Sequence, residues 1–307
     1  MADMSMRHVE CWLPHLQRFE PSHPLRALLG RADRMGEGAK GYLGGLAAYF
    51  DCGHGLPAAA LTRDHLAGDA AQAAAWLSAD PAWVQPDLSG ARLLACGQLP
   101  LSMDEARSLA EPLKPIFAEA DMSLEVSAPD RWHLRLPSSD TLPDFAAPEQ
   151  ALGEDLYEHL PHGLHARRWR ALFNDAQVVL HQHPVNAERR LRGLPPINSV
   201  WFWGGGALPS NVTATLEGVI GEDLLLLALA RRAGIAMQHR SAPSIATVEA
   251  GWLVDLQDQS ADDVARQWLP SLQALCSRKQ VMLAFASGER WLHRPWHRLR
   301  LWRRNAP

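Results

Sequence analysis

Residues 181–209 read HQHPVNAERRLRGLPPINSVWFWGGGALP, and this stretch is the most informative part of the chain. Within it, residues 198–203 are short, aromatic and bounded by turn-forming residues, which predicts a buried strand. Alternate side chains of a strand point to opposite faces, so Trp201 and Trp203 share one face. The glycines at 204–206 then allow a close approach of the backbone or a positive φ.

Polar side chains precede this strand and suggest the edge of an anion or small-ligand pocket. In this interpretation Arg189 binds an anion, Asn198 orients it and the tryptophans form a wall. A structural corner, in which bulky tryptophans require small neighbours, is the alternative and stays open. The candidate ligand-binding residues are His183, Asn186, Arg189, Asn198, Trp201, Trp203, Gly204 and Gly206.

The composition is that of a globular protein. The chain has 307 residues, of which 47% are hydrophobic and 21% charged, with a formal net charge of −4. An acidic balance argues against a nucleic-acid-binding polycation. The four widely separated cysteines indicate a reducing compartment rather than a disulfide framework or a zinc ribbon. Apolar runs are shorter than the ~18 residues of a membrane span, so we expect a soluble, cytoplasmic protein.

The pattern of helices and strands predicts an α/β core interrupted by a smaller unit. Residues 1–78 form the first part of the core, and 79–136 form a compact α+β unit. The Pro-, Ser- and Asp-rich segment 137–150 is the best linker candidate. Helices and strands alternate over 151–307, as in the second part of an α/β core.

Three further motifs carry weaker signals. Gly36–Gly41 matches G-x-G-x-x-G but follows a predicted helix, which favours a helix–helix loop over a phosphate site. Histidines recur at His159, His162 and His165 across a Pro and a Gly, without metal-ligand geometry. Residues 290–304 hold six Arg and three Trp and no acid. This favours a final element with its Trp face packed inward over a nucleic-acid site.

The 186–206 stretch carries a resemblance to a known family. Its pattern N-x-x-R-x-x-x-G-x-x-P-x-N-x-x-W-x-W-G-x-G resembles a segment of the archaeal-type, cofactor-independent phosphoglycerate mutases. The longer run from Leu160 is more closely similar to the RpfE-type regulatory proteins of proteobacteria. Weaker features agree, including Arg131-Trp132 in a predicted strand. The resemblance implies an α/β fold with an alkaline-phosphatase- and phosphoglycerate-mutase-like core and a small α+β cap-like insertion.

The same resemblance implies which sequence motifs the mutase reaction would need. The mutases use an N-terminal Asp-Gly-x-Gly-Asp motif, a Ser or Thr nucleophile, and Asp/His ligands for two divalent metals that stabilise the transferring phosphoryl group. Those motifs are missing from this sequence. We therefore expect no metal and no cofactor, and a regulatory or ligand-binding protein without catalysis. Its partner would be a phosphorylated small molecule or another protein, with neither nucleic acid nor membrane expected.

Two alternatives remain open. One is a metal-dependent phosphoglycerate mutase or phosphohydrolase, and the other is a nucleic-acid-binding protein that uses residues 290–304. The metal ligands of the first would come from Asp51, His54, His159, His162 and His165.

Overall fold

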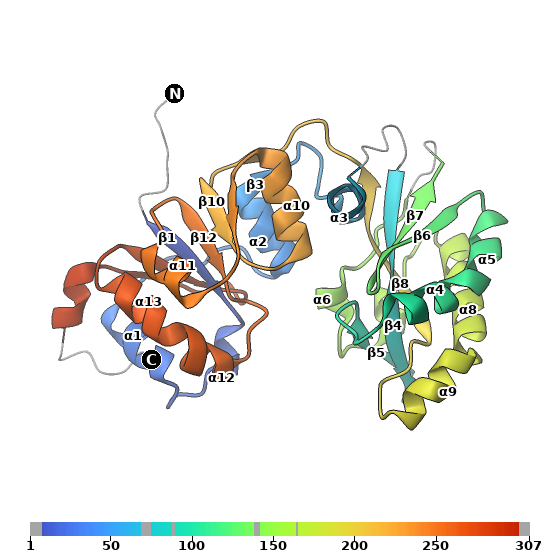
Figure 1. The fold of residues 1–307 in the computed structure, drawn as a ribbon, viewed down its shortest axis with the longest axis horizontal. Coiled ribbons are helices and arrows are strands. Elements are labelled where there is room, and N and C mark those ends of the chain that lie inside the picture. Colours follow the sequence, from blue (N-terminus) through green and yellow to red (C-terminus); the bar gives the residue numbers. More distant parts are fainter. Residues whose placement is uncertain (1–7, 69–74, 88–89, 138–141, 164, 301–307) are drawn as a thin grey trace. The chain divides into compact units, whose positions relative to one another are not determined.

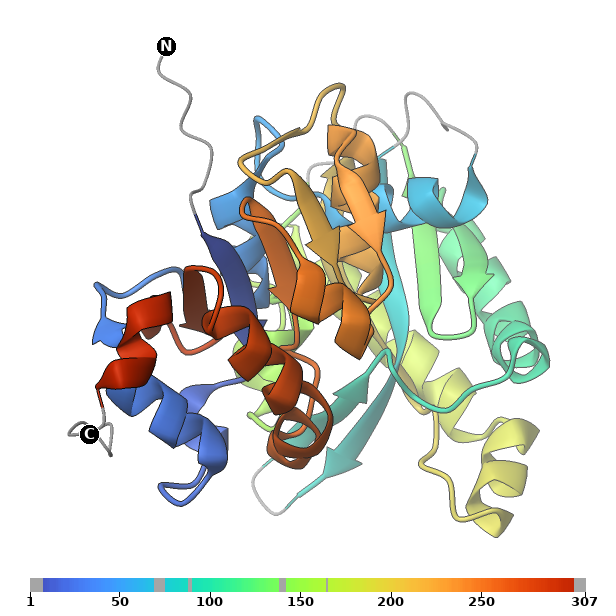
Figure 2. The ribbon, with the colours of Figure 1, turned by 60° about the vertical axis from the view of Figure 1, so that its left-hand side comes forward.

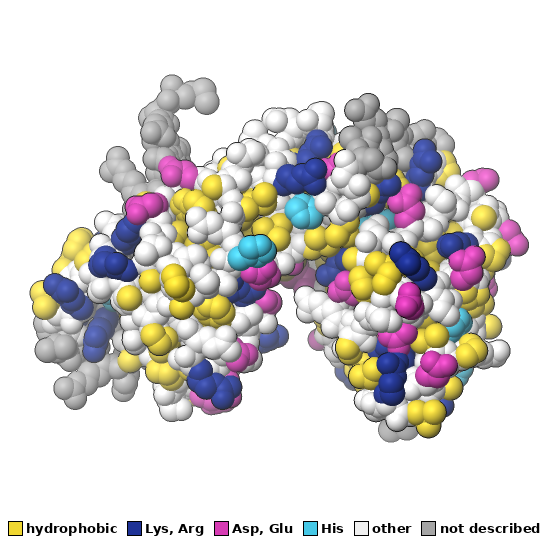
Figure 3. Space-filling view, in the orientation of Figure 1, with side chains coloured by type: hydrophobic (Ala, Val, Ile, Leu, Met, Phe, Trp, Pro, Cys, Tyr) yellow, Lys and Arg dark blue, Asp and Glu magenta, His cyan; other side chains and the backbone are white. Residues whose placement is uncertain are grey.

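The computed structural model describes residues 8–68, 75–87, 90–137, 142–163 and 165–300. The chain divides into two compact units (Figure 1). Unit 1 consists of Met1–Gly55 and Asn211–Pro307, and unit 2 of Leu56–Ser210. Both units combine sheets and helices, so the fold is of the mixed α/β class, as predicted. Acidic and basic side chains are interspersed on the visible face of each unit (Figure 3).

Within its described residues, unit 1 is built on a seven-stranded sheet in the order β11-β10-β12-β1-β13-β14-β2. From β11 to β13 neighbouring strands are parallel, whereas β14 and β2 are antiparallel to their neighbours. The central strand β1 is buried at every position, as expected inside a parallel sheet. The strands are β1 (Val9–Leu13), β2 (Asp33–Arg34), β10 (Gly218–Ile220), β11 (Ala236–Gln238), β12 (Trp252–Asp255), β13 (Val281–Phe285) and β14 (Arg290–His293). A small pair, β3 (Phe50–Asp51) and β9 (Thr213–Ala214), lies outside this sheet.

The two faces of β1 differ in character because side chains alternate along a strand. Val9, Cys11 and Leu13 belong to an apolar core that includes leucines of α1 and α13. Figure 2 draws the ribbons of these two helices in blue and orange-red. Glu10 and Trp12 lie on the opposite face. The helices of unit 1 are α1 (Pro24–Arg31), α2 (Tyr42–Tyr49), α10 (Leu224–Ala233), α11 (Ala242–Thr247), α12 (Ala261–Asp263) and α13 (Leu269–Cys276), with short helical turns η1 (Leu16–Arg18), η3 (Val264–Trp268) and η4 (Pro295–Leu299).

Unit 2 is organised around one long strand, β4. On one side β4 pairs with β8, and further pairings join β5, β7 and β6 into the same sheet. The strands are β4 (Ala75–Pro86), β5 (Ala91–Cys96), β6 (Ser123–Ala128), β7 (Arg131–Leu136) and β8 (Ser199–Ala207). The helices are α3 (Ala58–Ala67), α4 (Met103–Ala110), η2 (Glu111–Leu113), α5 (Lys114–Ala118), α6 (Pro148–Ala151), α7 (Leu156–His159), α8 (Ala166–His181) and α9 (Pro184–Leu191). Of the helices in the described part of the chain, none combines the length and apolarity needed to cross a membrane.

The division into units differs from the boundaries expected at 78, 136 and 150. The reason is β8, which pairs with β4 from Ala82↔Ser199 to Ala75↔Ala207 and so draws the 151–210 segment into one sheet with the 79–136 segment. The expected linker, in its described part, also packs in unit 2. There the ring of Phe145 meets Trp169 edge-on, with centroids 5.2 Å apart.

Local sequence patterns also predict a capping box at Ser102–Glu105, a helix end at Pro184 and a strand over 245–256. The structure confirms the first, extends the second and corrects the third. The capping box of α4 is present, because Ser102 and Glu105 each bond the other's backbone N–H. Pro184, expected only to end a helix, also begins α9, since its fixed φ and missing N–H suit the first helical turn. The stretch 245–256, expected to be one strand, contains the end of α11 followed by β12.

Two adjacent glycines of α2 provide a test of the packing over β1. A Cβ on Gly45 would lie 2.1 Å from Cζ2 of Trp12, whereas a Cβ on Gly44 has Ala39 Cβ at 4.0 Å as its nearest neighbour. Gly45→Ala should therefore lower the free energy of unfolding by about 1–3 kcal/mol through overpacking. Gly44→Ala should raise it by up to about 1 kcal/mol through helix propensity. Urea denaturation measures both, and equal effects would contradict this packing.

Candidate functional site

The predicted ligand-binding residues gather in unit 2 where α9 leads into β8. Asn186 is 3% exposed and joins two parts of this corner. Its Nδ2 donates to the carbonyls of Leu180 and Ile197, both at 2.8 Å, and its Oδ1 accepts from the N–H of Ile197 at 2.7 Å. The amide side chain thus satisfies buried backbone groups, whose loss of partners would be costly.

Arg189, the predicted anion ligand, is fully buried. Its Nε donates to the carbonyl of Pro195 and its Nη1 to that of Pro100, both at 2.9 Å. Its charge faces Glu105, whose carboxylate lies 3.5 Å from Nη1 and also closes the capping box of α4. A guanidinium placed in this way fixes the α9–β8 turn against α4. Its hydrogen bonds from Nε and Nη1 go to the protein itself, and its buried Nη2 has no hydrogen-bond partner among the described residues.

The remaining polar groups of the predicted site are also bonded internally. The side-chain amide of Asn198 bonds the backbone of Val84 as a paired strand would. Its Oδ1 accepts from the N–H of Val84 at 2.8 Å, and its Nδ2 donates to the carbonyl of Val84 at 2.7 Å. The indole of Trp201 donates to the carbonyl of Ala146. The indole of Trp203 donates to Asp80, a carboxyl group whose pKa is raised to about 6 by burial, against the opposing effect of Arg131.

His183 and the two glycines complete the corner. The Nδ1 of His183 accepts from the N–H of Val185 and caps α9. A Cβ on Gly204 would lie 2.8 Å from Ala58 Cβ, and one on Gly206 would lie 2.8 Å from Pro57 Cβ. Both glycines have positive φ, at +65° and +150°. This geometry matches the structural-corner alternative, and ligand binding by these residues stays a prediction.

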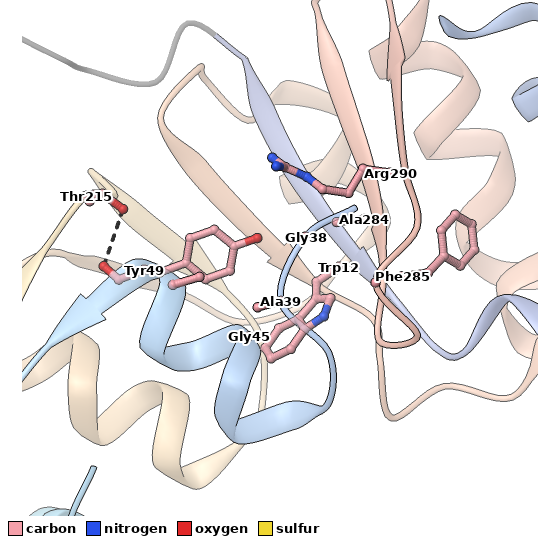
Figure 4. Close-up of a pocket in the computed structure, with 11 residues that line it drawn as sticks. Trp12, Gly38, Ala39, Gly45, Tyr49, Thr215, Ala284, Phe285 and Arg290 are labelled. Atoms are coloured by element: carbon pink, nitrogen blue, oxygen red, sulfur yellow. Dashed lines mark hydrogen bonds between the residues drawn. The ribbon is translucent and has the colours of Figure 1, made fainter. Parts of the chain in front are cut away.

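A cavity of about 200 Å³ lies in unit 1, on the Glu10–Trp12 face of β1 (Figure 4). Its walls include Trp12, Ala48, Tyr49, Thr215, Ala284 and Arg290. Trp12 pairs in register with Ala284, so the small side chain on β13 leaves room beside the indole. Stacking on Tyr42, with ring centroids 5.8 Å apart, holds the indole in place.

Glu10 supplies the buried charge behind this cavity. Its side chain is 1% exposed and accepts from the hydroxyl of Tyr49 at 2.9 Å. The Nε2 of His8 lies 3.0 Å away, and Nη2 of Arg290 lies 3.6 Å away. Burial and the neighbouring Glu10 raise the pKa of Tyr49 well above its usual value, so the phenol remains a donor. An acid inside the buried run VECWL was the sequence signal that could have revealed this group.

The glycine-rich segment Gly36–Gly41 forms part of the cavity wall and is not the helix–helix loop that was expected. It runs from β2 to α2 beside the β13–β14 hairpin. The N–H groups of Gly38 and Gly41 donate to the carbonyls of Gly288 and Ala286 at 2.7 and 2.8 Å. Amides bonded in this way cannot also cradle a phosphate group, so the alternative phosphate-binding interpretation has no donors at these two positions.

The residues of the alternative metal site are divided between the two units. Asp51 and His54 belong to unit 1, whereas His159, His162 and His165 belong to unit 2. Asp51 instead accepts from the N–H of Gly53 at 2.8 Å in a local turn. Across the residues that the structure describes, no group of three or more His, Cys, Asp or Glu side chains could hold a metal ion. Within those described residues, the donor set does not fit the two-metal centre that the mutase resemblance implies.

The described part of the Arg- and Trp-rich C-terminus contributes to the packing of unit 1. Arg294 and Arg300 both pair with Asp33 of β2. Trp291 packs edge-on against Phe285 in the core. Trp291 matches the expected inward Trp face, but Trp296 is 56% exposed and does not. Residues 301–304, which include the third tryptophan, lie outside the described residues.

Comparison with known proteins gives a distant similarity. No protein-family model matches the chain. It is 35% identical over 89 residues to the "Probable 2,3-bisphosphoglycerate-independent phosphoglycerate mutase" of Geobacter sulfurreducens, covering 29% of this chain and 22% of that one. It is 33% identical over 112 residues to the 2,3-bisphosphoglycerate-independent phosphoglycerate mutase of Methanosarcina barkeri, covering 36% and 28%. The matches thus span 22% and 28% of the length of these relatives.

Two solved structures were also found. The PH0037 protein from Pyrococcus horikoshii has 12% identity and a TM-score of 0.47, covering 94% of this chain and 87% of that chain. The cofactor-independent phosphoglycerate mutase from Thermoplasma acidophilum has 14% identity and a TM-score of 0.39, covering 94% and 89%. The distant sequence similarity to cofactor-independent phosphoglycerate mutases that was predicted is confirmed over the matched segments.

Asn186 and Asn174 form a matched pair that tests the structural role of the corner. Asn186→Ala removes a buried amide that bonds three backbone groups, and should lower the free energy of unfolding by roughly 2–3 kcal/mol. Asn174→Ala, at an exposed position of α8, should change it by less than about 0.5 kcal/mol. Urea denaturation distinguishes the two. A fully stable Asn186→Ala variant would argue for a role other than packing.

From the buried carboxyl group of Asp255, at the end of β12, we predict that the stability of the protein depends on pH. Burial, reinforced by Asp223, raises its pKa from 3.8 to about 8. Between these values the unfolded chain releases a proton that the folded chain keeps, so stability falls as the pH rises. Asp255→Asn should therefore gain stability over the unsubstituted protein from about pH 4 to about pH 8, by roughly 1 kcal/mol or more. Exposed Asp175→Asn should show no such trend in the same denaturation series.

Proposed function

We propose that this chain is an RpfE-type regulatory protein, in which a phosphoglycerate-mutase-like scaffold serves as a cytoplasmic, non-catalytic binding protein for a small organic anion. The observation that carries this proposal is the chemistry of the unit 1 cavity. Its walls offer a guanidinium from Arg290 beside the aromatic rings of Tyr49 and Trp12. A guanidinium binds an anion, and aromatic walls enclose the apolar part of a ligand.

Phosphoryl transfer requires different groups from those that bind an anion. In a two-metal centre, paired cations generate the nucleophile and stabilise the oxygens of the transferring group, so carboxylates and imidazoles must converge on each ion. One candidate ligand, Asp51, instead accepts from the N–H of Gly53 in a local turn. Similarity to the mutases extends over segments of the chain, and it supports a shared scaffold more directly than a shared reaction.

Regulation would follow from occupancy of the cavity. The wall residues come from β1, α2, β13, β14 and the segment after β9, so a bound anion would join elements that are far apart in sequence. Ligand binding stabilises whichever state holds the ligand. A protein partner that contacts these elements would then respond to the ligand.

The proposal predicts that the purified full chain does not interconvert 3-phosphoglycerate and 2-phosphoglycerate. The assay should include Mn²⁺, Zn²⁺, Co²⁺ and Mg²⁺ in turn, with the Methanosarcina barkeri mutase as positive control. Metal analysis of the protein should give sub-stoichiometric content. Metal-dependent turnover that is lost in Asp51→Asn or His54→Ala would overturn the proposal and establish the enzyme alternative.

A further inference from the structure

The size of the unit 1 cavity limits what it can hold. Its volume is about 200 Å³. A cavity of about 150 Å³ lined by apolar side chains is large enough to bind benzene. The additional volume admits one small polar group beside a ring-sized body. Nucleotides are too large to be enclosed.

The walls divide the cavity into an apolar part and a single cationic end. Trp12, Ala48 and Ala284 are apolar, and the ring of Tyr49 faces them. Among the lining side chains, Thr215 and Arg290 are the other polar ones, and the hydroxyl of Thr215 already donates to the carbonyl of Tyr49 at 3.3 Å. In Figure 4 the Arg290 side chain and the Tyr49 hydroxyl extend toward the same space. The matching ligand has an apolar body and one acidic group.

Arg290 is held in position and retains bonding capacity. Gly38 packs against its aliphatic part, since a Cβ there would lie 2.7 Å from Cδ of Arg290. Within the described residues its ion pair is with Glu10, through Nη2 at 3.6 Å, and 33% of the side chain is exposed. A guanidinium has five N–H donors in a rigid fork, so a second carboxylate can still bind along the free edge.

Glu10 determines how much negative charge the ligand can carry. It is buried beside Arg290 and balances the guanidinium charge. Every additional negative charge on a ligand is attracted by Arg290 but repelled by Glu10 across a low-dielectric interior. Two of the nearby backbone donors, on Gly38 and Gly41, are already used. These conditions favour a monoanion over a phosphate dianion.

We propose that the unit 1 cavity binds a small monocarboxylic acid with an apolar body, about the size of benzoate, with its carboxylate on Arg290. This inference rests on the proposed binding function and specifies its ligand class. It departs from the phosphorylated ligand expected from sequence, because the wall polarity and the charge balance between Arg290 and Glu10 both favour a monoanion over a dianionic phosphate ester.

The test compares four probes by ligand-observed NMR and calorimetry on the full chain: benzoate, neutral benzamide, dianionic phenyl phosphate and 3-phosphoglycerate. Benzoate should bind, and the other three should bind at least tenfold more weakly. Arg290→Met should weaken benzoate binding at least tenfold. Ala48→Phe, which fills the cavity from α2, should abolish it, whereas Ala47→Phe on the same helix should not. Both positions are exposed, and Ala47 does not line the cavity.

The outcomes separate this inference from the proposed function. If phenyl phosphate or 3-phosphoglycerate binds more tightly than benzoate and Ala48→Phe abolishes that binding, the carboxylate assignment is overturned while a ligand-binding role stands. If benzoate does not bind, or binds equally to the Ala48→Phe variant, the cavity assignment itself is overturned. Thermal melts of each variant establish that it is folded, and turnover of 3-phosphoglycerate would separately overturn the non-catalytic role.

Discussion

The buried charge of Glu10 is the constraint around which the cavity side of unit 1 is arranged. A carboxylate on the central strand of a parallel sheet cannot remain ionised without partners. Tyr49, His8 and Arg290 provide them from α2, from the residue just before β1 and from the antiparallel strand β14. Because these partners come from separate parts of the chain, the same requirement that compensates Glu10 also places a phenol and a guanidinium beside one cavity.

In unit 2, polar side chains of similar type serve buried backbone groups and not a buried carboxylate. There Asn186, Arg189 and Asn198 bond backbone atoms of turns and strands that would otherwise be buried without partners. Arg189 and Arg290 illustrate the contrast. The first is fully enclosed and directed at carbonyls, whereas the second is one-third exposed and faces a cavity. Chemical type alone does not distinguish a guanidinium that is bonded within the protein from one that faces a cavity, whereas burial and the identity of the acceptors do.

The sequence was informative where structure is local. The strand of residues 198–203 and the capping box at Ser102 depend on neighbours within a few positions, so periodicity and spacing predicted both. α9 was missed because proline was interpreted as a stop, although it also begins helices. The cavity could not be predicted, since it forms only when β1, α2 and the β13–β14 hairpin meet. Of the groups around the cavity, Glu10 alone could be recognised from the sequence, because it is an acidic residue within an apolar strand.

The motif that carries the mutase resemblance is also the motif that holds the corner of unit 2. Asn186, Arg189, Asn198 and the two tryptophans of that pattern bond the protein's own backbone or a buried carboxyl group. Similarity in such residues indicates a shared scaffold, because these bonds are needed wherever the corner is built. It does not by itself indicate a shared reaction, which depends on groups at a site. The activity of this chain is therefore better sought in the charge and shape of the unit 1 cavity.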